Sequence, residues 1–107
     1  MDPKATVQTI GDAIDALDTK LQSGNPPINS PEWQQLHDSR ENLDGQQQAL
    51  VLMDIKADDV TFQSAAEDID TATKSLQADI NKQGTIATII NDVSQISAAA
   101  DTILKIV

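Results

Sequence analysis

The chain has 107 residues, a usual size for one domain, so we expect a single domain over residues 1–107. It contains no cysteine, which excludes disulfides, thiolate metal sites and thiol catalysis. Its 17 Asp and Glu against 7 Lys and Arg give a formal net charge of −10, which repels nucleic-acid phosphates and favours a protein partner with a basic surface.

Two further features bear on location. No stretch approaches ~18 uninterrupted apolar residues, so we expect no membrane-spanning helix. The first residues, Met1 to Lys4, lack the basic head and apolar run of a secretory signal. These features predict a cytoplasmic protein, and they leave open export by a pathway that does not use a cleaved signal.

The first periodic stretch predicts a helix near residues 3–22. Its apolar residues are spaced three and four apart and share one helical face: Val7, Ile10, Ile14, Leu17 and Leu21. Asp2 and Pro3 open this helix, and the pair Pro26-Pro27 must follow its end because two prolines cannot continue a helix.

A second helix is predicted near residues 31–56. Ser30 can cap its first backbone N–H groups, and Pro31 suits the first helical position. Arg40 and Gln47 interrupt an apolar stripe made of Trp33, Leu36, Leu43 and Leu50. Gly45 weakens this helix, but no capping residue follows it, so we expect the helix to be unbroken.

The remaining stretches predict helices near residues 59–83 and 85–106. Asp58-Asp59 supplies the start of the third helix, Gly84 a left-handed stop, and Thr85 a cap for the fourth helix. The apolar register breaks at Gly84, which indicates a turn and not one long helix. Four helices of similar length with mostly short connections predict an all-α, antiparallel four-helix bundle.

No pattern of catalytic or ligand-binding residues emerges. His37, the single histidine, has Asp38 and Glu41 near it, but a metal site needs three or four converging ligands. The stretch that begins at Asp68 starts like an EF-hand loop, yet its sixth position is Thr73 where that loop needs glycine. We therefore expect no enzyme, no cofactor and no metal ion, and we expect His37 to face solvent.

Two segments carry more apolar residues than one bundle stripe requires. Residues 49–53 form an apolar run that wraps around a helix, and the end of the fourth helix is similarly apolar. The other helices of the bundle can cover both segments. Otherwise they form an interface with a partner or with a second copy in a homodimer, through Val51, Leu52, Met53, Ile103, Leu104, Ile106 and Val107.

The Asn25-Pro26-Pro27 turn between two helices, in a chain rich in Ala, Gln, Ser, Thr and Asp, resembles helical subunits of bacterial secretion apparatus and filaments. This resemblance covers about the first 45 residues. Our leading expectation is a non-enzymatic acidic protein that acts by protein–protein interaction, as inhibitors, immunity proteins and adaptors do. The alternative that the resemblance implies is an exported structural subunit that assembles with itself. A small hydrolase or metal protein is the third class.

Overall fold

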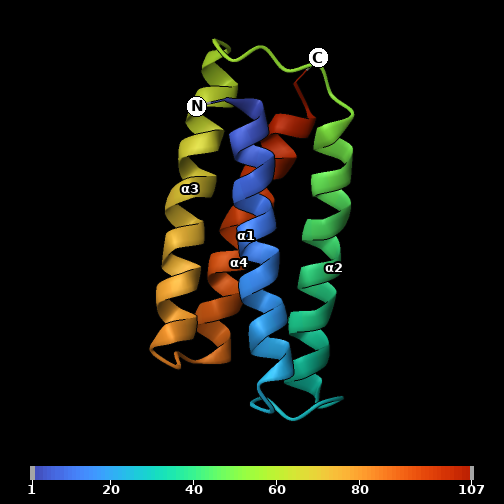
Figure 1. Cartoon of the computed structure of the whole chain (residues 1–107), viewed down its shortest axis with the longest axis vertical. Coiled ribbons are helices and arrows are strands. Elements are labelled where there is room, and N and C mark those ends of the chain that lie inside the picture. Colours follow the sequence, from blue (N-terminus) through green and yellow to red (C-terminus); the bar gives the residue numbers. More distant parts are fainter. Residues whose placement is uncertain (1, 107) are drawn as a thin grey trace.

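The computed structural model describes residues 2–106, and these form four helices and no strand. The helices are α1 (Pro3–Gln22), α2 (Pro31–Val51), α3 (Val60–Asn81) and α4 (Ile86–Leu104). They pack side by side in an elongated body of 42 × 22 × 17 Å (Figure 1). The predicted all-α four-helix bundle is confirmed, and α2 runs unbroken through Gly45.

Each helix begins at a side-chain cap. The side-chain oxygens of Asp2, Ser30, Asp59 and Thr85 each accept a hydrogen bond from a backbone N–H in the first turn of the helix that follows. Such a cap satisfies a donor that has no partner within the helix and is typically worth about 1 kcal/mol. The start signals in the sequence therefore act as expected.

Consecutive helices run antiparallel, but they do not follow one another around the bundle. Helix α1 packs against α2 and α3, and α4 packs against α2 and α3, so α2 and α3 lie on opposite corners (Figure 1). The connection from α2 to α3 crosses the end of the bundle at the top of Figure 1. As a result, the neighbours α1 and α3 point the same way, and so do α2 and α4.

This crossing depends on where α2 ends. The prediction that this helix continues to residue 56 is wrong, because α2 ends at Val51 and Leu52 is its C-terminal cap. The chain then leaves the helix, and the side chains of Met53 and Ile55 pack against the core. Ending the helix early gives a connection, residues 52–59, that is long enough to reach the opposite corner of the bundle.

The α3–α4 turn also differs in detail from the prediction. The left-handed residue is Gln83, with φ 55°, and not Gly84. Gly84 is needed for close approach instead, because its N–H donates to the carbonyl oxygen of Asp79 at 2.7 Å. A Cβ at position 84 would lie 3.0 Å from that oxygen.

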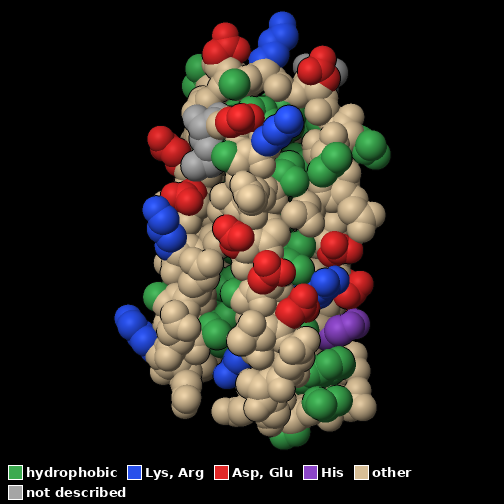
Figure 2. Space-filling model, viewed as in Figure 1, with side chains coloured by type: hydrophobic (Ala, Val, Ile, Leu, Met, Phe, Trp, Pro, Cys, Tyr) green, Lys and Arg blue, Asp and Glu red, His purple; other side chains and the backbone are tan. Residues whose placement is uncertain are grey.

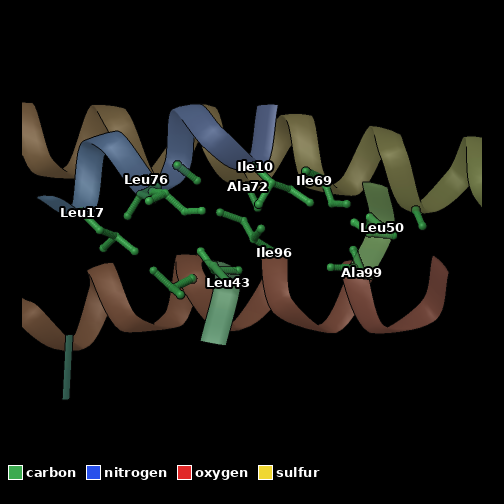
Figure 3. Close-up of a cluster of buried hydrophobic side chains, with 14 of the residues drawn as sticks. Ile10, Leu17, Leu43, Leu50, Ile69, Ala72, Leu76, Ile96 and Ala99 are labelled. Carbon is green, nitrogen blue, oxygen red and sulfur yellow. The ribbon is translucent and has the colours of Figure 1, made fainter. Parts of the chain in front are cut away.

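The core runs along the bundle axis and draws side chains from all four helices (Figure 3). The helices contribute unequally. Helices α1, α3 and α4 each bury seven residues, whereas α2 buries only Leu36, Leu43 and Leu50. Helix α2 is therefore attached by one leucine every second turn.

Candidate functional site

The end of the bundle that the α2–α3 connection crosses carries three of the four exposed large apolar side chains of residues 2–106. Leu52 is 87% exposed, Val60 82% and Val51 62%. Asp54 and Asp58 are exposed between them along the chain. We call these five residues the crossover surface. Hydrophobic side chains are visible over the end of α2 at the upper right of Figure 2.

The predicted interface residues differ in how much of each side chain the structure exposes to solvent. Val51 and Leu52 are exposed, as contact with a partner requires, and Met53 is half-buried against the core. Ile103 has no exposed surface and belongs to the core, so the folded chain cannot offer it to a partner. Leu104 and Ile106 are partly buried against the core, and Val107 lies outside the described residues.

The position of Ile103 has a simple cause. It lies seven residues after Ile96 and fourteen after Ile89, so all three share the inward face of α4, and all three are fully buried. The apolar end of α4 therefore completes the bundle's own stripe. Of the predicted interface residues that the structure describes, Val51 and Leu52 are the exposed ones.

A second feature is an ion-paired group on the face formed by α1 and α2. Arg40 Nε and Nη2 lie 3.0 and 3.4 Å from the two carboxylate oxygens of Asp18, and Nη1 lies 3.1 Å from Glu41 Oε1. The hydrogen bond to Asp18 raises the pKa of Arg40 above its usual value. Acidic side chains gather over the middle of these two helices in Figure 2, and Arg40 holds two of the carboxylates in place.

A third feature is a pair of carboxyl groups between α3 and α4. Asp92 is only 6% exposed, and its Oδ2 has no hydrogen-bond partner. Burial, followed by a hydrogen bond to Asp79 and repulsion by the charge of Asp79, raises the pKa of Asp92 to about 6. Within residues 2–106, no Lys, Arg or His lies within ion-pair distance of either carboxyl group. Folding therefore leaves a negative charge on Asp92 without compensation.

His37 lies in a local cluster on α2. Its ring stacks on Trp33, with centroids 5.1 Å apart, and its two nitrogens lie 3.8 Å from Asp38 Oδ1 and Glu41 Oε1. In the part of the chain that the structure describes, no three side chains of His, Asp or Glu converge as metal ligands. The stacking ties His37 to the aromatic residue at the start of α2.

Sequence reasoning missed both the Arg40 group and the carboxyl pair, although a signal was present for each. Arg40 stands at a position of the α2 stripe where an apolar residue is expected, which indicates an inward polar contact. Asp92 lies three residues after Ile89 and four before Ile96, and so shares their buried face. A polar residue on an apolar stripe is the informative observation in such a sequence.

Over residues 2–106, no helix is both long and apolar enough to span a bilayer. No protein-family model, no curated protein and no solved structure matches this chain.

Proposed function

We propose that this protein is a non-catalytic binding protein whose crossover surface contacts a partner protein with an apolar pocket in a basic surrounding. The observation that supports this most is the adjacent pair Val51 and Leu52, which stand out from the end of α2 with most of their surface in water. Single exposed apolar residues are common, but two neighbours at the end of a helix form a knob that a pocket can enclose.

The expected affinity comes from burial of this knob. Burying a Val or Leu side chain that was exposed contributes roughly 1.5–3 kcal/mol. Because the side chains are already held at the end of a formed helix, little ordering of the protein opposes the gain. Val51 and Leu52 together therefore contribute roughly 3–6 kcal/mol to binding if the partner offers an apolar pocket.

Charge supports a basic partner. Asp54 and Asp58 are exposed within a few residues of the knob, on either side of the exposed Lys56, and the whole chain carries a net charge of −10. Opposite charges around an interface speed up encounter and suppress wrong partners. Inhibitor, immunity and adaptor proteins share this mode of action. The exported subunit that assembles with itself is the second candidate, since the same knob could contact another copy.

A designed probe tests the proposal. The probe is an amphipathic helical peptide made of Leu and Lys, with a Leu and Glu peptide as its counterpart of opposite charge. We expect the Lys peptide to bind, and we expect Val51→Ser with Leu52→Ser to weaken binding by at least about tenfold, the equivalent of 1.4 kcal/mol. Calorimetry measures both.

Ile28 provides a matched control, because it is 64% exposed and lies in the loop at the opposite end of the bundle. Ile28→Ser should leave the affinity for the Lys peptide unchanged. Equal binding by the wild type and the double variant, or equal binding of the two peptides, would overturn the proposal. A dimer in sedimentation that Leu52→Ser dissociates would support the self-assembling subunit instead.

A further inference from the structure

We propose that α2 can detach from the bundle and unfold as a separate unit while α1, α3 and α4 stay folded together. The first observation is the poor apolar attachment of α2. Its fully buried apolar residues are Leu36, Leu43 and Leu50, with Trp33 partly buried against the core, whereas α1 buries five apolar residues and α3 and α4 bury six each. Because apolar burial supplies most of the free energy that holds a helix in a bundle, α2 is the helix held least strongly.

Polar side chains fill the positions between the leucines. On the α1 side, Gln47 Nε2 donates to the carbonyl oxygen of Val7 at 3.0 Å. On the α4 side, Asn42 Nδ2 donates to Ser97 Oγ at 2.9 Å, and Gln46 Nε2 donates to the Ser97 carbonyl oxygen at 3.0 Å. Water can replace each of these bonds when α2 leaves, so each contributes little net stability.

The α2–α4 contact is also incompletely closed. A groove of about 650 Å³ runs between these helices, and its lining includes Asn42, Gln46 and Ser97. Beside it, Gln46 Oε1 is buried without a hydrogen-bond partner. A buried acceptor that lacks a partner costs free energy, and opening of α2 returns that acceptor to water.

The intrinsic helix stability of α2 is low as well. Gly45 stands in its middle, and apart from the backbone of α2 itself and the two neighbouring residues, a Cβ built there would meet nothing within 4 Å. This glycine is therefore not required for packing, but it weakens the helix by about 1 kcal/mol relative to alanine. A helix with few apolar anchors and an internal glycine gains little from remaining folded.

The connections permit the motion. Residues 23–30 precede α2 and residues 52–59 follow it, so an eight-residue segment borders this helix on each side. The α3–α4 pair is joined by the much shorter segment 82–85. Helix α2 can thus leave without pulling on its neighbours, and its departure uncovers apolar faces of α1 and α4 that the closed form hides.

Native-state hydrogen exchange on the full chain tests this inference. If α2 opens alone, its most protected amides should exchange at least about tenfold faster than the most protected amides of α3 and α4, which wait for global unfolding. If the chain unfolds only as a whole, the slowest amides of all four helices share one rate, and that result would overturn the inference.

A variant in α3 gives an independent check. Lys74 is exposed on α3 and forms an ion pair with Asp70 at 3.1 Å, and α3 lies on the corner of the bundle opposite α2. Lys74→Gly should speed exchange of the slowest α3 and α4 amides roughly fivefold, because it destabilises the closed and the α2-open forms equally relative to the unfolded chain. The α2 amides should keep their rate. Equal acceleration in α2 would contradict a separate opening.

Gly45→Ala checks that the opening includes unfolding of the helix. It stabilises helical α2 and should slow exchange of the most protected α2 amides roughly fivefold. Unchanged α2 exchange in this variant would show that the helix does not unfold when it opens, and the proposal in its present form would be wrong.

Discussion

Asp79, in the last turn of α3, and Asp92, in the second turn of α4, bring their carboxyl groups close enough to interact across the α3–α4 contact. One shared proton lets the two groups form a hydrogen bond, whereas two negative charges in this place repel each other. Because Asp92 is almost fully buried, water screens that repulsion poorly.

The pair predicts a dependence of stability on pH. The pKa of Asp92 is about 6 in the folded chain and near its usual 3.8 in the unfolded chain. Between about pH 4 and 6 the folded chain therefore keeps a proton that the unfolded chain has released, and stability falls as the pH rises through this window. Above it, the ionised Asp92 costs up to about 3 kcal/mol, at about 1.4 kcal/mol per pKa unit.

Asp92→Asn tests this prediction, because the amide keeps the shape and carries no charge. We expect the variant to be more stable than the wild type at pH 7.5 and to lose most of the fall in stability between pH 4 and 6, as measured by urea unfolding. Asp12→Asn, at an exposed site on α1, removes the same formal charge and should change the pH profile much less. Parallel profiles for the wild type and Asp92→Asn would contradict the prediction.

Arg40 predicts a stability effect that depends on salt. Its guanidinium bridges Asp18 on α1 and Glu41 on α2, and its side chain is largely buried. Arg40→Gln should lower the free energy of unfolding by about 1 kcal/mol in low salt and by less in 1 M salt, since partly exposed ion pairs are screened. Arg40→Lys should recover only part of the loss, because one ammonium group cannot donate to both Asp18 oxygens in the same fork.

Two glycines predict opposite results from the same substitution. Gly45→Ala should raise the free energy of unfolding by about 1 kcal/mol, because nothing lies near the added methyl group and alanine favours the helix. Gly84→Ala should lower it, because the methyl group would lie 3.0 Å from the Asp79 carbonyl oxygen and the short α3–α4 turn cannot easily yield. Thermal unfolding followed by circular dichroism measures both. The same sign in both variants would be inconsistent with this account.

The sequence predicted the helices well where two kinds of signal coincided. Ser30 with Pro31, and Thr85 after Gly84, mark starts with a local cap, and the apolar stripes that follow them identify the buried faces. The end of α2 was predicted wrongly, because the apolar run through Met53 continues the helical pattern although the chain has already turned to cover the core. No local signal marks that turn.

Which helices are neighbours and which lie on opposite corners of the bundle could not be predicted from the sequence, for a related reason. Residues 52–59 appeared to belong partly to a helix, so the connection looked too short to cross the bundle. The exposure of Leu52 and the burial of Ile103 also depend on tertiary packing, because both residues belong to apolar segments of similar composition. Which of two apolar segments faces water is decided by what the other helices cover.

Because the α2–α3 connection crosses the bundle, helix ends of like partial charge lie next to each other. Since α1 and α3 are parallel neighbours, the partially positive N-terminal ends of both lie side by side at the crossover end, and the partially negative C-terminal ends of α2 and α4 lie side by side next to them (Figure 1). In a bundle whose neighbours all alternate, these partial charges would alternate too and largely cancel. Here the C-terminal ends of α2 and α4 form the negative half of that end, and Val51 and Leu52 lie at the end of α2.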